Sequence, residues 1–331
     1  MTSRLTRVAA VLTAAPLALA LVACSSEETV TAAGTGAAAA TTISIEDNHG
    51  TLEVPASPQR VVALDNRVFE TLSSWDVPLV AAPKGLMGQG LWPEYVDDEG
   101  VLDVGMHREP NLESVVAAEP DLIIGGMRFA DHYGDLKSQN PDAAVVELSP
   151  REGEDLSAEI VRQVETLGTI FGREADAATM VGAYEQAIAD ATAAYDGEST
   201  VVGLITSGGE IAYSAPVTGR SIGMLFPTLG LEPAIEQAAE DTSHGDDISV
   251  EAIAAANPDW IIVLDRDGAG VGEGEYQPAK ELIGGSEALA SVTAVEKDQI
   301  IYLDPNFYLT EDIQSYTALY QQIADAFAAA G

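Results

Sequence analysis

One twelve-residue pattern occurs twice in this chain, and it constrains the fold more than any other feature. Residues 113–124 read ESVVAAEPDLII and residues 251–262 read EAIAAANPDWII, at a constant offset of 138 positions. In each copy a helical segment must end before Pro-Asp, because proline disfavours the helical conformation of the preceding residue. The apolar run that follows is typical of a buried parallel strand. The chain is therefore expected to contain two equivalent α/β units.

Strand-like and helix-like segments alternate around both copies, which favours two α/β lobes. The expected strands are Val61–Leu64, Pro78–Ala82, Leu122–Ile124 and Ala144–Leu148 in the first lobe, and Thr200–Ile205, Trp260–Leu264 and Gln299–Leu303 in the second. The expected helices are Asn66–Trp75 with Asn66 as its cap, Ser221–Leu229, and Glu311–Ala330. A hairpin is expected over Ile43–Val54, with its turn at residues 47–50.

The stretch between the lobes has a helical pattern without strands. Leu156–Phe171 is amphipathic, Gly172 interrupts it, and Glu174–Tyr195 continues with apolar residues at helical spacing. The simplest interpretation is one long connecting helix and therefore a stiff pair of lobes. The expected domains are an N-terminal lobe (42–155), connecting helices (156–197) and a C-terminal lobe (198–331).

The first forty residues are typical of an exported, lipid-anchored protein. Met1–Arg7 is basic, and Val8–Val22 is apolar but too short to span a bilayer comfortably. Cys24, the only cysteine, ends this segment and has no partner for a disulfide. We expect a lipoprotein signal peptide (1–23), lipidation of Cys24, and a flexible tether (24–41) that holds the protein on the extracytoplasmic face of the cell membrane. The alternative for Cys24 is a buried free thiol.

The charge of the chain makes its few cations informative. The formal net charge is −38, and it becomes −40 when Arg4 and Arg7 leave with the signal peptide. Such a surface repels nucleic acid and anionic lipid headgroups. Arg128 and Arg266 follow the two repeated strands at the same offset, and ligands of open α/β sheets bind outside the carboxyl ends of strands. Both arginines are expected to face an interlobe cleft and hold an anion; the alternative for each is a surface salt bridge.

Several short motifs occur in order along nearly the whole mature chain. They are Pro83-Lys84-Gly85, Glu109-Pro110-Asn111, Pro120-Asp121 with Arg128, Gly219-Arg220-Ser221, Ser243-His244-Gly245, Val263-Leu264-Asp265-Arg266 and Tyr302-Leu303-Asp304-Pro305. From about Thr42 to Ala328 the chain resembles the substrate-binding lipoproteins of iron-siderophore ABC importers, in the branch for catecholate chelates such as petrobactin.

The resemblance implies a class III solute-binding protein, with two Rossmann-like α/β lobes joined by a single long interdomain helix. It implies a monomer that has no intrinsic cofactor, captures a ferric siderophore in the interlobe cleft, and delivers it to an ABC permease with its ATPase.

The resemblance also implies a basic pocket for the chelate, in which Arg128, Arg220 and Arg266 match three arginines. Planar guanidinium groups suit the oxygens of a ferric catecholate, which is a multiply charged anion. Lys84 is either a further cation of the cleft or a solvated turn residue.

A histidine and a tyrosine complete the iron coordination in several members of this family, and the matching residues are His244 and Tyr308. Fe(III) is a hard cation that prefers phenolate oxygen and accepts imidazole. The alternatives are a solvated loop histidine and an aromatic side chain that lines the cleft. The segment 306–312 departs from the family pattern, in which Ser or Gly follows the aromatic run.

Glu113 and Glu251 occupy equivalent places in the repeat. The resemblance implies that each docks onto arginines of the permease dimer, whereas the alternative is a favourable interaction of an acidic residue with a helix start.

Enzyme templates do not fit this chain. It contains no Gly-x-Ser-x-Gly or His-Glu-x-x-His motif and no cysteine nucleophile. We therefore predict a binding protein rather than an enzyme. The alternatives are a binding protein for haem or cobalamin and, less favoured, a secreted metal-dependent enzyme.

Overall fold

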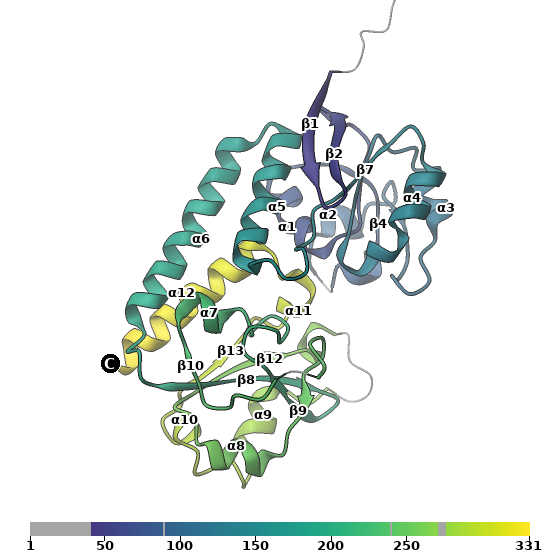
Figure 1. The fold of residues 1–331 in the computed structure, drawn as a ribbon. Coiled ribbons are helices and arrows are strands. Elements are labelled where there is room, and N and C mark those ends of the chain that lie inside the picture. Colours follow the sequence, from purple (N-terminus) through teal and green to yellow (C-terminus); the bar gives the residue numbers. More distant parts are fainter. Residues whose placement is uncertain (1–40, 89, 239, 271–275) are drawn as a thin grey trace, which may run out of the picture. The chain divides into compact units, whose positions relative to one another are not determined.

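The computed structural model describes residues 41–331, apart from residues 89, 239 and 271–275. The expected signal peptide, the tether and Cys24 lie outside the described residues. The described chain forms a two-stranded hairpin, two larger sheets, and helices that alternate with strands (Figure 1). The predicted α/β class is therefore confirmed. None of the described helices combines the length and the apolar character needed to cross a membrane.

The first larger sheet contains five parallel strands in the order β5-β4-β3-β6-β7. They are β3 (Val61–Ala63), β4 (Leu79–Ala82), β5 (Leu102–Asp103), β6 (Leu122–Gly125) and β7 (Ala144–Glu147). The preceding hairpin consists of β1 (Thr42–Asp47) and β2 (Gly50–Pro55), as predicted. The helical segments here are η1 (Asn66–Val68), α1 (Phe69–Ser74), η2 (Lys84–Leu86), α2 (Pro93–Val96), α3 (Leu112–Ala117), η3 (Met127–His132) and α4 (Tyr133–Gln139).

The second larger sheet has the order β11-β9-β8-β12-β13, and β10 also pairs with β8. Its strands are β8 (Thr200–Ser207), β9 (Glu210–Ser214), β10 (Glu232–Pro233), β11 (Asp246–Asp247), β12 (Trp260–Asp265) and β13 (Ile300–Tyr302). Strands β8, β12 and β13 are parallel, whereas β9 is antiparallel to β8. Gly208 and Gly209, with φ of 61° and 80°, form the tight turn between β8 and β9; this hairpin was not predicted from the sequence. The helical segments are α7 (Leu225–Leu229), α8 (Val250–Ala256), η4 (Asp267–Ala269), α9 (Ala279–Gly284), α10 (Thr293–Glu296) and α11 (Phe307–Thr310).

Two long helices and a C-terminal helix connect and support these sheets. Helix α5 (Leu156–Phe171) ends at Gly172, whose φ of 63° breaks the helix, and α6 (Glu174–Ala194) then leads to β8. The C-terminal helix α12 (Ile313–Ala330) packs along α6 (Figure 1). The predicted long connecting helix is present as α6, and the break that glycine was expected to make separates it from α5.

The internal repeat corresponds to two equivalent pieces of structure. The residue before each Pro-Asp, Glu119 and Asn257, has a left-handed φ of 44° and 48°. Asp121 accepts hydrogen bonds from the backbone nitrogens of Gln59 and Arg60 at 2.7 and 2.9 Å, next to the start of β3. In the second copy Asp259 accepts one from the nitrogen of Thr200 at 3.0 Å, at the start of β8. The repeated Pro-Asp therefore ends a helix and fixes the start of the neighbouring strand in both copies.

The core explains why the strands are apolar on both faces. Val61 and Ala63 of β3 pack into the largest buried cluster, whereas Val62 and Leu64 pack into a second one on the opposite face. The largest cluster also contains residues of α5, α6, α12 and the second sheet. Burial of both faces is expected for parallel strands covered by helices.

Three predicted helix starts were wrong. Asp65, and not Asn66, caps the first helical segment, because its carboxylate accepts a hydrogen bond from the nitrogen of Arg67. Helix α7 begins only at Leu225, since Ser221 has a left-handed φ of 62°. Helix α12 begins at Ile313 rather than at Glu311, which has a left-handed φ of 46°.

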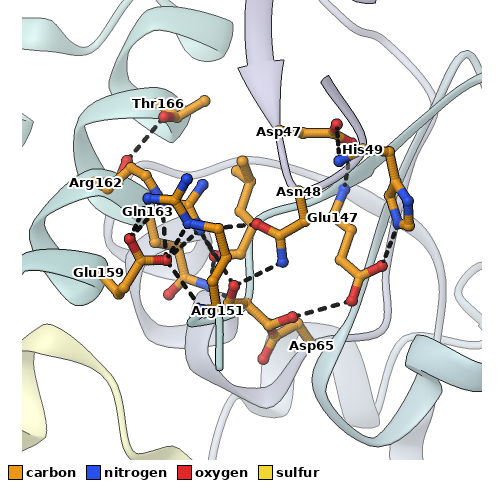
Figure 2. A network of polar contacts seen from close by, with 12 residues as sticks. Asp47, Asn48, His49, Asp65, Glu147, Arg151, Glu159, Arg162, Gln163 and Thr166 are labelled. Atoms are coloured by element: carbon orange, nitrogen blue, oxygen red, sulfur yellow. Dashed lines mark hydrogen bonds and ion pairs between the residues drawn. The ribbon is translucent and has the colours of Figure 1, made fainter. Parts of the chain in front are cut away.

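A polar network joins α5 to the hairpin and to the segment after β7 (Figure 2). Glu159 of α5 is 3% exposed and contacts Arg151 at 2.6 Å and Arg162 at 2.8 Å. Arg162 also donates to Asn48 Oδ1 at 2.9 Å and to the carbonyl of Ser149 at 3.2 Å. Burial alone would raise the pKa of Glu159, but its bonds to Arg151 and Arg162 outweigh this and lower it to about 2. The network fixes the position of α5 against the first sheet.

Candidate functional site

Three arginine side chains converge on the ring of Tyr308. The guanidinium carbons of Arg220, Arg266 and Arg128 lie 4.1, 5.2 and 5.3 Å from the ring centroid. Tyr308 is 8% exposed, and the side chains of Arg220 and Arg266 are 15% and 24% exposed, so the ring is buried and the guanidinium groups are partly shielded from water. A guanidinium within about 6 Å of an aromatic ring is attracted by its quadrupole. We call these four residues the arginine cluster; it brings together all three arginines that the sequence singled out.

The repeat explains how two of these arginines reach one place. Arg128 lies in η3, just after β6, and Arg266 directly follows β12. Each follows the carboxyl end of a parallel strand that has parallel neighbours on both sides, which is where ligands of such sheets bind. Tyr308 comes from the short helix α11.

Arg220 is held by the loop between β9 and α7. A side chain at Gly219 would collide with Ser214 and with the backbone of Ala215, so the turn requires glycine. The backbone nitrogen of Arg220 donates to the carbonyl of Thr242 at 3.0 Å. The loop conformation therefore determines where this guanidinium points.

Each of the two repeat arginines donates a short hydrogen bond to a neighbouring side chain, and Arg128 Nη2 also lies 3.5 Å from the carbonyl of Tyr308. Arg128 Nη1 donates to Asn66 Oδ1 at 2.9 Å, and Arg266 Nη1 donates to Ser207 Oγ at 2.7 Å. Arg266 Nε is buried and has no hydrogen-bond partner within the described part of the chain. Buried donors of this kind are rare and call for an explanation, such as a ligand.

Glu311 is the acidic partner of the cluster. Its carboxylate accepts hydrogen bonds from Arg220 Nε at 3.0 Å, from Arg220 Nη2 at 2.5 Å and from Ser221 Oγ at 2.6 Å. Arg67 Nη2 lies 3.8 Å from it. Burial alone would raise the pKa of Glu311, but Arg220 and then Arg67 outweigh this and lower it to about 2.

The charges of the cluster also shift the pKa values of Arg128 and Tyr308. The pKa of Arg128 is lowered, first by burial and then by the positive charge of Arg220. Burial would raise the pKa of Tyr308, yet it is lowered because Arg220, Arg266 and Arg128 favour the phenolate. A phenol that ionises more readily than usual is suited to coordinate a hard metal, and the three cations beside it are suited to hold an anionic chelate of that metal.

The structure does not bring His244 into this cluster. His244 is half exposed, and its Nδ1 lies 3.5 Å from Asp241 Oδ2. Its loop is nevertheless adjacent, because Thr242, two residues earlier, accepts the backbone hydrogen bond from Arg220. Across the described residues, no group of three or more His, Cys, Asp or Glu side chains is placed to hold a metal ion.

Lys84 contacts carbonyl groups at the end of a short helix. Its Nζ donates to the carbonyls of Asp98 at 2.7 Å and Val96 at 3.0 Å. The ammonium group thus stabilises the C-terminus of α2, which favours neither of the two functions considered for Lys84 from the sequence.

Glu113 and Glu251 are exposed residues in the first turns of α3 and α8. The helices begin after caps of the same kind: Asn111 accepts from the nitrogen of Ser114, and Ser249 accepts from the nitrogen of Ala252. The two glutamates are therefore structurally equivalent and open to a partner.

Sequence reasoning did not identify Glu311, Arg67 or Asn66 as site residues. Asn66 connects the first sheet region with α11, since its Nδ2 donates to the carbonyls of Leu86 at 3.1 Å and Leu309 at 3.0 Å. The departure of residues 306–312 from the family pattern lies at Glu311, but it did not single out this residue.

Comparison with known proteins places this geometry in context. A family model described as "Periplasmic binding protein" matches residues 61–307. The petrobactin-binding protein YclQ of Bacillus subtilis is 28% identical over 286 residues, which cover 84% of this chain and 85% of YclQ. The ferric-anguibactin-binding protein FatB of Vibrio anguillarum is 28% identical over 272 residues, which cover 82% of each chain. The crystal structure of YclQ superimposes with a TM-score of 0.72 and 25% identity, covering 87% of this chain and 99% of that one.

Proposed function

Because this chain belongs to the periplasmic binding protein family, we propose that its arginine cluster captures a ferric siderophore of the catecholate type and that the protein delivers it to an ABC permease. The predicted assignment to binding proteins rather than enzymes is confirmed by the family. The relatives named for petrobactin and ferric anguibactin support an iron chelate as the ligand.

The observation that carries the proposal is the convergence of Arg128, Arg220 and Arg266 on Tyr308. Three partly buried guanidinium groups at one ring repel one another and are costly to assemble, even in a chain of net charge −38. An anionic ligand offsets that cost, because a guanidinium and an anion about 4 Å apart attract each other by roughly 4 kcal/mol before desolvation is subtracted. Screening over about 8 Å at physiological salt prevents the acidic surface from cancelling this local attraction.

Tyr308 gives the cluster a second property. Its lowered pKa favours the phenolate, and phenolate oxygen is a ligand that Fe(III) prefers. When a chelate leaves iron positions open, Tyr308 would fill one, and His244 would fill another after its loop moves.

The remaining assignments complete this proposal. Residues 42–155 and 198–331 act as lobes that enclose the ligand, and residues 156–197 connect them. Glu113 and Glu251, exposed and equivalent, dock onto the permease, which works with its ATPase. Cys24 carries the lipid that holds the monomeric protein at the outer face of the cell membrane.

Titration with ferric catecholates tests the proposal, with quenching of tryptophan fluorescence as the readout. We expect sub-micromolar affinity for the unmodified protein and a loss of about a hundredfold or more in the double variant Arg128→Ala, Arg266→Ala, because each lost guanidinium contact removes on the order of 1.4 kcal/mol or more.

The double variant Arg60→Ala, Arg151→Ala is the matched control, since it removes two positive charges outside the cluster. It should bind as tightly as the unmodified protein. Unchanged affinity in Arg128→Ala, Arg266→Ala would disprove the cluster as the site. Binding of haem or cobalamin, with no response to ferric chelates, would show that the ligand is not a ferric siderophore.

A further inference from the structure

Glu311 places a permanent negative charge inside the arginine cluster. Its carboxylate is 2% exposed and is bound by both Arg220 and Ser221, with Arg67 at 3.8 Å. The pKa of about 2 keeps this group ionised throughout the physiological range. Any anion held by the three arginines is therefore repelled by Glu311.

The local backbone gives no reason for a glutamate at this position. Glu311 has a left-handed φ of 46°, which glycine adopts at no steric cost and other residues adopt at a cost. The cap of the following helix is Asp312, whose carboxylate accepts from the nitrogen of Ser315 at 2.7 Å. A turn that had only to connect α11 with α12 would be better served by glycine.

Arg220 also depends on this carboxylate for its direction. Glu311 occupies two of its donor nitrogens, Nε and Nη2, in a bidentate pair. Such pairs fix the plane of a guanidinium group. Arg220 is thereby held with its face 4.1 Å from the Tyr308 centroid. Glu311 thus orients one cation of the cluster and neutralises part of its charge.

The strength of this repulsion depends on the ligand. Coulomb energy is proportional to the product of the charges, so a trianionic chelate is opposed three times as strongly as a monoanionic chelate at the same distance. Iron bound by two catechols is monoanionic, and iron bound by three is trianionic. The two complexes contain the same chemical groups and differ in net charge, which determines how strongly Glu311 repels them.

We propose that Glu311 is a specificity-determining residue that biases the site towards ferric catecholates of low negative charge, such as those with two catechols on the iron. This inference rests on the proposed function and names the class of chelate within it. It also agrees with the role of Tyr308, because a chelate with two catechols leaves iron positions open for protein ligands.

The test compares two synthetic ferric chelates, one with two and one with three catechol groups on the same amide backbone. Dissociation constants are measured by fluorescence titration for the unmodified protein, Glu311→Gln and Glu311→Gly. We expect both variants to shift the affinity ratio towards the three-catechol chelate by on the order of tenfold, equivalent to about 1.4 kcal/mol. Glycine suits the left-handed backbone, so Glu311→Gly keeps the test valid if the glutamine variant does not fold.

Two controls separate charge from packing. Glu311→Asp retains the charge and should keep the ratio of the unmodified protein. Glu159→Gln removes an equally buried carboxylate between two arginines outside the cluster, and it should also keep that ratio.

A parallel change in both affinities in Glu311→Gln and Glu311→Gly would overturn the charge-selecting role while leaving the proposed function intact. If the unmodified protein binds neither chelate, the proposed function itself fails, and this inference fails with it.

Discussion

Glu159 and Glu311 are two buried glutamates that each lie between two arginines, yet their surroundings differ. Around Glu159, Arg162 is shared among Glu159, Asn48 and the carbonyl of Ser149, and every one of these contacts lies within the first sheet region and α5 (Figure 2). Around Glu311, Arg67 comes from the first sheet region and Arg220 from the second.

The donors of the two regions differ as well. Within the described residues, Arg67 Nε and Arg266 Nε are buried without a hydrogen-bond partner, whereas no side-chain atom of Glu159, Arg151 or Arg162 is in that state. A network in which every buried polar group has a hydrogen-bond partner stabilises a fold. Buried donors without a partner call for another explanation, such as a ligand. The same ion-pair motif therefore stabilises the fold around Glu159, whereas under the proposed function it serves recognition around Glu311.

The largest expected effect comes from the loss of Arg220, which pairs with Glu311 as Arg162 pairs with Glu159. The double variant Arg220→Ala, Glu311→Gly differs from Glu311→Gly only by the loss of the Arg220 guanidinium group, and it leaves no buried carboxylate unpaired. We expect ferric catecholate affinity to fall about a hundredfold relative to Glu311→Gly alone, as measured by fluorescence titration.

Arg162→Ala is the counterpart in the other region, and it should leave the affinity within about twofold. The comparison would break if Arg162→Ala weakened binding as much as the loss of Arg220, because recognition would then not be confined to the cluster.

A smaller effect is expected on stability from Glu159→Gln. Its pKa of about 2 lies below the ordinary value of 4.5, so the ion pairs of Glu159 stabilise the fold above pH 4.5 and this contribution is lost as the pH falls towards 2. We expect a loss of roughly 2 kcal/mol in the free energy of unfolding at pH 7, since Arg151 is partly exposed and weakens the pair.

Urea unfolding at pH 7 and pH 3 checks this expectation. The difference between the unmodified protein and Glu159→Gln should shrink at the lower pH. An equal difference at both pH values would show that packing, and not charge, accounts for the effect.

The smallest expected effect has the opposite sign and concerns Asp312, next to Glu311. Burial raises its pKa to about 6 from 3.8, although Ser315 donates hydrogen bonds that act in the other direction. A carboxyl group with a raised pKa contributes stability below pH 3.8 that is lost as the pH rises through 6. Asp312→Asn keeps a helix cap and should raise the melting temperature at pH 8 by a few degrees, corresponding to roughly 1–2 kcal/mol.

The melting temperatures of Asp312→Asn and the unmodified protein should converge near pH 4. If the gain at pH 8 persists at pH 4, the buried charge of Asp312 is not its source.

The sequence predicts features that depend on neighbouring residues, and it misses those that depend on contacts between distant residues. The repeat predicted β6, β12 and the end of a helix before each Pro-Asp, because proline acts on the residue before it. The left-handed φ of Glu119 and Asn257 was not predicted. The same offset predicted that Arg128 and Arg266 occupy equivalent places. Ser221 was wrongly assigned to a helix. Its left-handed φ of 62° occurs two residues after Gly219, which packs tightly against Ser214, and no local pattern reports that contact.

Glu311 could not be found in this way. Its partner Arg220 is 91 positions away, and a single glutamate before an amphipathic segment is typical of an ordinary helix start. The family likeness supplied the third arginine and Tyr308, but the contact of Arg67 with Glu311 depends on how the two sheets meet across α11.

The largest buried cluster has a consequence for the energetics of capture. It combines one face of each sheet with α5, α6 and α12 and includes Tyr308, so the ring on which the arginines converge belongs to a common packed interior. Protein interiors are dense and resist deformation. A binding protein with such a rigid core loses little conformational entropy when its ligand binds. More of the contact energy then contributes to affinity.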